Sequence, residues 1–140
     1  MPQTSDPALR RLLERTRSIA VLGIKSGDTD EAFRVPRYLQ ASGYRIHPVN
    51  PKLDEVLGEC CVARVGELEV GVDLLDVFRD ARHLPAHVDE ILALPRPPRA
   101  VWLQLGIRDD AVSERLEAAG IEVVQDRCIM VEHRRLLGPR

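Results

Sequence analysis

The feature that most constrains the fold of this chain is a repeated alternation of short apolar runs with stretches of helical periodicity. Apolar residues with helical spacing precede the first run and occupy three of the four gaps between runs. The remaining gap contains residues 53–70, which keep no steady period and are expected to be mostly irregular. Strands joined by helices pair in parallel through right-handed crossovers, so we expect an α/β fold. Specifically, the pattern predicts a Rossmann-like three-layer sandwich with a mainly parallel sheet of five or six strands. The apolar runs cover residues 19–24, 44–49, 72–78, 100–103 and 121–124.

Capping residues mark the ends of two predicted helices. Asp6 followed by Pro7 is typical of an N-cap and a first helical position, so residues 1–17 are expected to hold a helix that packs on the remaining chain. Gly43 is expected to end the helix that follows the first strand. Pro36 is compatible with that helix only if it lies in the first turn, because proline lacks the N–H that a helix interior requires.

Length and composition exclude several classes of protein. A chain of 140 residues is expected to form one domain, residues 1–140, and a formal net charge of -2 does not favour nucleic acid as a partner. No apolar run approaches the roughly 20 residues of a membrane span, and the start lacks the apolar core of a secretory signal. We therefore expect a cytoplasmic protein without a membrane partner. Cys60, Cys61 and Cys128 are expected to be reduced thiols, and no Cys or His spacing resembles a metal site.

Four short segments follow predicted strands and are expected to meet at one edge of the sheet. They are residues 23–27, 50–52, 78–79 and 104–106. In such folds ligands bind beyond the carboxyl ends of the strands, where the winding direction reverses. Lys52 stands near the position where NAD-binding folds place a carboxylate for the ribose diol. A cation there favours a phosphorylated ribose, which both coenzyme A (CoA) and NADP contain.

The loop after the first strand is a candidate phosphate site. Gly23 and Gly27 allow a tight turn, and the following helix would direct its N-terminal amides at the same spot. Asp28, Asp30 and Glu31 would repel a phosphate unless they point outward or cap the helix.

Four motifs, in this order and spacing, resemble a known family. They are residues 43–52 with the end Val-Asn-Pro-Lys, 76–79 (Asp-Val-Phe-Arg), 101–107 (Val-Trp-Leu-Gln-Leu-Gly-Ile) and 126–129 (Asp-Arg-Cys-Ile). Together they are similar to the small stand-alone CoA-binding proteins related to the N-terminal domain of the succinyl-CoA synthetase alpha subunit. The chain departs from the synthetase pattern in lacking a Gly-x-Gly-x-x-Gly loop. It also has no room for the synthetase's second, phosphohistidine-bearing domain, so ligase activity is not expected.

The resemblance implies a binding role for each edge segment. Lys52 would meet the 3′-phosphate of CoA, Lys25 and Ser26 would belong to the pyrophosphate loop, and residues 104–106 would border the pantetheine arm. No residue is assigned a catalytic role. The predicted cofactor-binding residues are Gly23, Ile24, Lys25, Ser26, Asn50, Pro51, Lys52, Phe78, Arg79, Gln104, Leu105 and Gly106.

Three functions remain open at this point. The first is a CoA-binding or acyl-CoA-binding protein that is not catalytic on its own. The second is an NADP-dependent reductase, although the chain lacks an evident proton donor such as a Tyr-x-x-x-Lys pair. The third is a regulatory subunit with a vestigial nucleotide site, and a homo-oligomer or a protein partner stays open for each. His83 and His87 have the spacing of paired metal ligands, but Pro85 is expected to open a helix that leaves His83 outside it.

Overall fold

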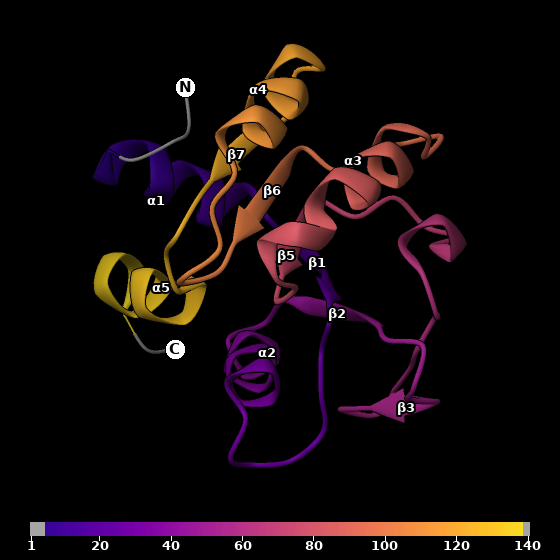
Figure 1. Ribbon diagram of the computed structural model, residues 1–140. Helices are drawn as coiled ribbons and strands as arrows, with labels where there is room; N and C mark the ends of the chain where they lie inside the picture. The colour runs from indigo at the N-terminus through magenta and orange to yellow at the C-terminus, as the bar shows by residue number, and fades with distance from the viewer. Residues whose placement is uncertain (1–4, 139–140) are drawn as a thin grey trace.

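The core of the protein is a five-stranded parallel sheet with helices on both faces. The computed structural model describes residues 5–138. The sheet has the order β2-β1-β5-β6-β7 (Figure 1). Its strands are β1 (Ser18–Leu22), β2 (Arg45–Val49), β5 (Leu74–Val77), β6 (Ala100–Leu103) and β7 (Glu122–Val124). The predicted Rossmann-like α/β sandwich is therefore confirmed, with five strands in its sheet.

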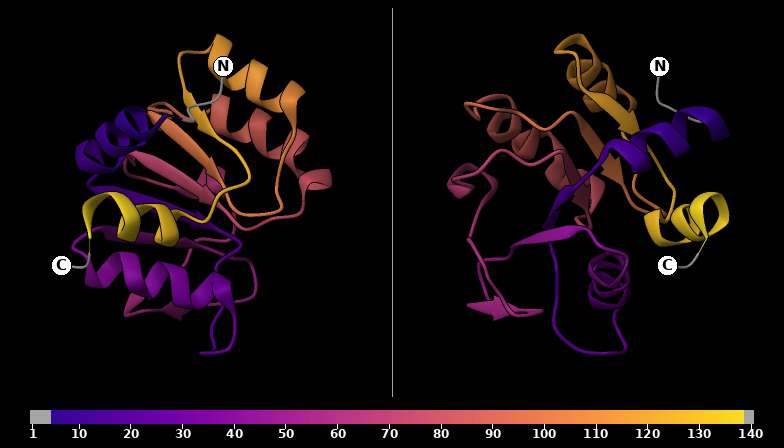
Figure 2. Two further views of the ribbon diagram at one scale, coloured as in Figure 1. Left: turned by 90° about the vertical axis from the view of Figure 1, so that its left-hand side faces the viewer. Right: turned by 180° about the vertical axis from the view of Figure 1, so that it is seen from behind.

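Two helical layers cover the sheet. The helices are α1 (Asp6–Arg15), α2 (Glu31–Ala41), α3 (Leu84–Leu92), α4 (Asp110–Ala118) and α5 (Ile129–Leu137), with short 3-10 turns η1 (Val65–Glu67) and η2 (Ala81–His83). The first, second and fifth helices lie on one face, and α3 and α4 lie on the other (Figure 2). Alternate residues of each central strand pack into one or the other of two apolar clusters. No helix within residues 5–138 is long and apolar enough to cross a membrane.

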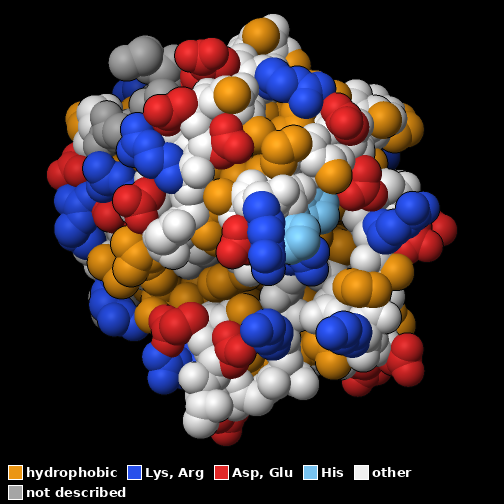
Figure 3. Space-filling view, in the orientation of Figure 1, with side chains coloured by type: hydrophobic (Ala, Val, Ile, Leu, Met, Phe, Trp, Pro, Cys, Tyr) orange, Lys and Arg blue, Asp and Glu red, His pale blue; other side chains and the backbone are white. Residues whose placement is uncertain are grey.

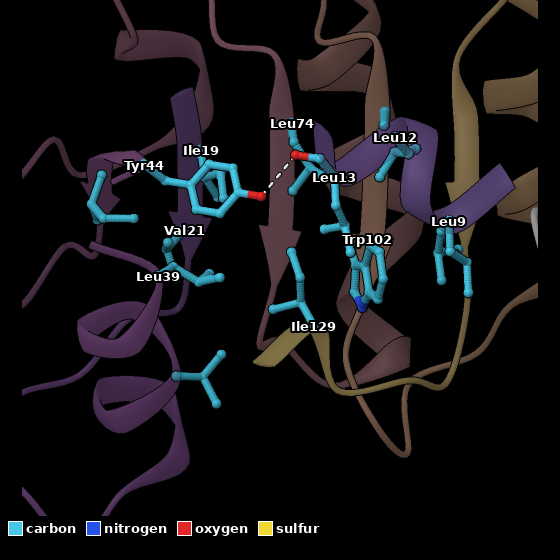
Figure 4. Packing of buried hydrophobic residues seen from close by; sticks show 14 of the residues in the cluster. Leu9, Leu12, Leu13, Ile19, Val21, Leu39, Tyr44, Leu74, Trp102 and Ile129 are labelled. Carbon is cyan, nitrogen blue, oxygen red and sulfur yellow. Dashed lines mark hydrogen bonds between the residues drawn. The ribbon is translucent and has the colours of Figure 1, made fainter. Parts of the chain in front are cut away.

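Aromatic side chains fix the first helix and the middle of the sheet. The Tyr44 hydroxyl donates a hydrogen bond of 2.7 Å to the carbonyl of Leu13 in α1 (Figure 4). Trp102 of β6 is fully buried, and its indole N–H donates to the Arg127 carbonyl over 2.8 Å. Each buried aromatic thus satisfies its polar atom while filling the core. At the surface, Arg135 of α5 binds both carboxylate oxygens of Asp6 over 2.9 Å, which ties α1 to α5.

Pro36 lies inside α2 and not in its first turn, so the expected position was wrong. The helix already begins at Glu31, more than one turn before Pro36, because the Asp30 carboxylate accepts the Ala32 N–H over 2.9 Å and caps the helix. Proline cannot donate to the carbonyl four residues before it, which is that of Ala32. The Lys25 N–H takes that acceptor at 3.1 Å. The missing helix bond is thereby replaced by a tie between the helix and the loop after β1.

The segment expected to be irregular contains a small hairpin. Strands β3 (Glu55–Val56) and β4 (Glu59–Cys60) pair antiparallel across a turn in which Leu57 and Gly58 have φ angles of 56° and 78°. A two-residue turn with positive φ at both positions is the connection that suits a twisted hairpin. The hairpin forms a separate two-stranded sheet. Beyond it, Val62 forms an isolated parallel bridge with Val49, so this segment is joined to the edge strand β2.

Candidate functional site

A cavity of about 450 Å³ opens at the carboxyl ends of β1, β2 and β5. The chain passes from β1 to β2 on one side and then to β5 on the other, so this is the point where the winding direction reverses. Ligands bind at such switch points in open α/β sheets. The cavity is lined by Leu22, Gly23, Lys25, Val49, Asn50, Pro51, Lys52, Ala63, Arg64, Val65, Phe78, Arg79, Asp80, His83, His87 and Glu90.

Three of the four predicted edge segments contribute to this cavity. The residues from the prediction that line it are Gly23, Lys25, Asn50, Pro51, Lys52, Phe78 and Arg79. Ile24 does not line it, because its side chain is fully buried in the apolar core between the sheet and α2. Ser26 is exposed on the adjoining loop, outside the cavity lining.

Gln104, Leu105 and Gly106 lie at the same edge of the sheet but outside the cavity lining. The side-chain oxygen of Gln104 accepts the N–H of Ile129 over 3.1 Å at the start of α5. The N–H of Gly106 donates to Asp126 over 2.7 Å. Leu105 is 71% exposed. This segment therefore holds the β6–α4 loop to the start of α5.

The loop after β1 approaches the chain after β5 very closely at Gly23. Gly23 has a φ of 84°, and a Cβ atom there would lie 3.2 Å from Cδ of Arg79 and 3.3 Å from the carbonyl carbon of Phe78. The N–H of Gly23 donates to the Val49 carbonyl over 3.0 Å. The left-handed backbone and the tight contact both require glycine. Gly23 is therefore bonded to the end of β2 and in close contact with the chain just after β5.

Replacing Gly23 with alanine is expected to lower the free energy of unfolding by roughly 1–3 kcal/mol, because the substitution adds backbone strain and a contact that moves Arg79. Gly120→Ala is the matched control. Gly120 has the same φ of 84°, but a Cβ atom there would have no neighbour within 4 Å, so its loss should be the smaller, about 1 kcal/mol. Urea unfolding of the two variants and the wild type measures both values. Equal losses would show that the close approach at Gly23 contributes nothing.

Each of the three carboxylates near this loop is paired with a cation, so none of them meets an incoming anion as a free negative charge. Asp30 caps α2, and its second oxygen lies 3.5 Å from Nζ of Lys25. Asp28 lies 3.3 Å from Arg37, and Glu31 forms an ion pair with Arg34. The sequence left two alternatives for these acids, outward-pointing or capping side chains, and the structure contains both.

Asn50 determines where Lys52 lies. Its side-chain amide donates to the Ile24 carbonyl, and its side-chain oxygen accepts the Lys52 N–H over 2.7 Å. The Asn50 side chain therefore connects the loop after β1 to the turn after β2. Lys52 itself is exposed, and its ammonium makes no ion pair with any residue of the described chain.

A second wall of the cavity comes from residues that sequence reasoning did not select. Residues 63–65 follow the hairpin, and the Glu67 carboxylate holds them by accepting the N–H groups of Ala63 and Arg64 at 2.9 and 3.0 Å. His83, His87 and Glu90 come from the end of η2 and from α3. His83 and His87 are four residues apart and His87 and Glu90 are three apart, which is the spacing of neighbours on one face of a helix and was the signal available in the sequence. The spacing of the two histidines by itself is typical of a pair of metal ligands.

Cations outnumber free carboxylates around the cavity. Lys52, Arg64 and Arg79 make no side-chain ion pair within residues 5–138. The two carboxylates of the lining are engaged, since Asp80 caps η2 and Glu90 lies 3.3 Å from His87. Figure 3 shows histidine side chains among lysines and arginines on this face of the molecule. The excess of unpaired positive charge in a hollow suits an anionic ligand.

The structure offers no grouping typical of a metal centre. Among residues 5–138, no three His, Cys, Asp or Glu side chains come close enough together to hold a metal ion. The three cysteines are free thiols, and burial raises the pKa of Cys61.

The fold and cavity define a Rossmann-like α/β protein with a cationic hollow at its switch point. The chain belongs to the CoA-binding domain family, whose model matches residues 17–134. This finding confirms the family resemblance inferred from the motifs.

Known proteins similar to this chain include both small relatives and one large synthetase. The uncharacterized Bacillus subtilis (strain 168) protein YneT is 32% identical over 133 residues, which is 95% of this chain and 97% of YneT. The structure of the Thermus thermophilus protein cell-free ID.343 has a TM-score of 0.89 at 47% identity, over 95% of this chain and 99% of that one. A dinucleotide-forming acetyl-coenzyme A synthetase from Ca. Korarchaeum cryptofilum shares the fold, with a TM-score of 0.68 and 19% identity. There the likeness covers 82% of this chain and 26% of the synthetase.

Proposed function

We propose that this protein binds CoA or an acyl-CoA in the cavity at the switch point and acts as a binding module without catalysis of its own. Membership of the CoA-binding domain family supports the class of ligand. No Ser, Thr or Cys lies among the described residues that line the cavity, so no hydroxyl or thiol of these three types is available there to take an acyl group.

The observation that carries the proposal is the placement of Lys52. Its ammonium is unpaired within the described chain, at the carboxyl end of β2, on a turn that Asn50 holds in place. A phosphorylated ribose would supply the missing anion there, and CoA has its phosphate at the 3′ position. The loop from Gly23 to Ser26 would then adjoin the pyrophosphate. Gln104, Leu105 and Gly106 enter the proposal as edge residues that a long pantetheine arm would pass after leaving the cavity.

Thermal unfolding with four ligands tests this function. CoA at about 100 times its dissociation constant is expected to stabilise the protein by roughly 2.7 kcal/mol, and dephospho-CoA at the same concentration by clearly less. NAD has no phosphate on a 2′ or 3′ ribose hydroxyl and serves as the negative control. An equal or larger effect of NADP would favour the reductase alternative. No stabilisation by any of the four would contradict the proposal and favour a vestigial site in a regulatory subunit.

A further inference from the structure

Two buried nitrogen atoms in the cavity wall have no hydrogen-bond partner among residues 5–138. They are Nε of Arg79, just after β5, and Nε2 of His87, in α3. Both residues line the same cavity. Buried polar atoms almost always have a hydrogen-bond partner. Two buried nitrogens without one in the same cavity therefore need a specific explanation. A phosphoryl oxygen bound by both side chains would supply one, and because neither nitrogen has more than 1 Å² of accessible surface, the side chains must turn toward the cavity to meet it.

Glu90 determines which nitrogen of His87 is left for a ligand. Its Oε1 lies 3.3 Å from Nδ1 of His87, one turn earlier on the same helix. A carboxylate only accepts, so Nδ1 carries the proton in this contact and neutral His87 keeps a lone pair on Nε2. The other oxygen of Glu90 accepts the N–H of Gly66 over 3.4 Å. Glu90 therefore orients the imidazole and also holds the 63–67 segment against α3.

Burial is the main factor that favours the neutral form of His87. Burial lowers the pKa of His87, and the nearby positive charges of Arg79 and His83 lower it further. Glu90 acts in the opposite direction through its hydrogen bond and charge. Lys25, Lys52 and Arg64 add positive charge to the lining, and Asp80 adds negative charge that is directed to the N–H of Arg82.

A neutral imidazole beside an unpaired guanidinium group is poised for an anionic oxygen. Such an oxygen accepts a hydrogen bond from Nε–H of Arg79, and its charge favours protonation of His87 at Nε2. The resulting imidazolium donates from Nε2 to the anion and from Nδ1 to Glu90. The proton comes from hydronium or a buffer acid in the solvent, whose bond to it breaks as the N–H bond forms, and no bond to carbon or phosphorus changes.

We propose that Arg79 and His87 form a second phosphate-binding point, distinct from Lys52, and that His87 takes up a proton when a phosphoryl group binds there. This inference rests on the proposed function, because it assigns the pyrophosphate of a CoA-type ligand to these two residues. Glu90 is then a positioning residue, since it acts on the ligand only through the imidazole.

Calorimetric titration with dephospho-CoA is the direct test. The 3′-phosphate monoester of CoA titrates near neutral pH and would add its own proton exchange, whereas the pyrophosphate diester of dephospho-CoA does not. At pH 7.5, repeating the titration in buffers of different ionisation enthalpy gives the number of protons taken up. We expect net uptake approaching one proton per ligand for the wild type. We expect none for His87→Asn and reduced uptake for Glu90→Gln, whose amide lacks the charge that stabilises the imidazolium.

His47→Asn is the matched control, because the pKa of His47 in β2 is also lowered by burial but His47 lies outside the cavity lining. It should keep the wild-type proton uptake. The affinity of the wild type for dephospho-CoA should fall as pH rises from 6 to 8.5, by at most about tenfold per pH unit, as one linked proton requires. The affinity of His87→Asn should stay flat over that range.

Two results would overturn the inference. Binding of dephospho-CoA by the wild type without proton uptake would show that His87 stays neutral beside the ligand. Uptake that persists in His87→Asn would assign the proton to another group. In either case CoA binding itself still stands, whereas failure of both CoA and dephospho-CoA to bind overturns the proposed function and this inference together.

Discussion

Lys52→Ala is expected to weaken CoA binding by roughly 10–100-fold and to leave the affinity for dephospho-CoA unchanged within about twofold. A hydrogen bond to a charged group contributes about 1.5–3 kcal/mol, and each 1.4 kcal/mol is a factor of ten in affinity. Lys52 has no ion-pair partner within the described chain, so its removal frees no buried carboxylate. The loss of affinity should therefore appear only for the ligand that has the 3′-phosphate. Calorimetric titration of both ligands with wild type and variant gives the four affinities.

Lys25→Ala is the matched control for this cycle. Lys25 lines the same cavity, but its ammonium lies 3.5 Å from Asp30 at the other side, near the loop after β1. Its removal should weaken CoA and dephospho-CoA by the same factor, because both ligands contain the pyrophosphate. If Lys52→Ala also weakened both ligands equally, Lys52 would belong to the pyrophosphate site or to general attraction of anions, and the assignment of the 3′-phosphate would be wrong.

The sheet could be predicted from sequence because its strands are buried on both faces. Such strands read as continuous apolar runs, and the run at 100–103 coincides with β6. The start of helix α5 lacks an equivalent local signal. Its N-cap, Cys128, makes no side-chain capping bond, and the N–H of Ile129 is bonded instead by Gln104, 25 residues away in sequence. Contacts between distant residues start this helix, and no local pattern shows them.

Half of the candidate site followed from topology alone. The rule that ligands bind beyond the carboxyl ends of strands selected Gly23, Asn50, Lys52 and Arg79, which line one cavity. The wall formed by residues 63–65 was not predictable, because a hairpin and the Glu67 carboxylate bring it back to the sheet.

His87 was also missed, for a different reason. The i, i+4 spacing of His83 and His87 is typical of metal ligands and does not indicate an anion site. The contact that gives His87 a role is to Glu90 on the same helix, and its distance from Arg79 depends on how α3 packs after η2. Periodicity places such a residue on a helix face, but only the packing of that face decides whether it borders a cavity.

Asp76→Asn is expected to make the protein more stable at pH 8, because keeping the buried carboxyl protonated costs about 1.4 kcal/mol for each pH unit above its unfolded-state pKa of about 4. Asp76 lies in the middle of β5, between Val21 of β1 and Trp102 of β6, with no exposed surface. Neither carboxylate oxygen has a hydrogen-bond partner in the part of the chain that the structure describes, and burial raises the pKa of Asp76 well above the usual value. Asparagine has nearly the same shape and does not ionise, so the substitution removes the charge without opening a cavity.

The sign of the pH dependence distinguishes this explanation from a simple packing effect. Because the pKa of Asp76 is raised in the folded protein, its contribution to stability is fully present below the unfolded-state pKa of about 4 and is lost as pH rises through the folded-state value. Urea unfolding of both proteins at several pH values between 4 and 8.5 should therefore show a difference that is near zero at pH 4 and grows with pH. Asp54→Asn, at an exposed position, should show no such trend. A wild type that remained more stable than Asp76→Asn at pH 8 would mean that the buried carboxylate is ionised and paired, and its charge would then be a structural part of the sheet.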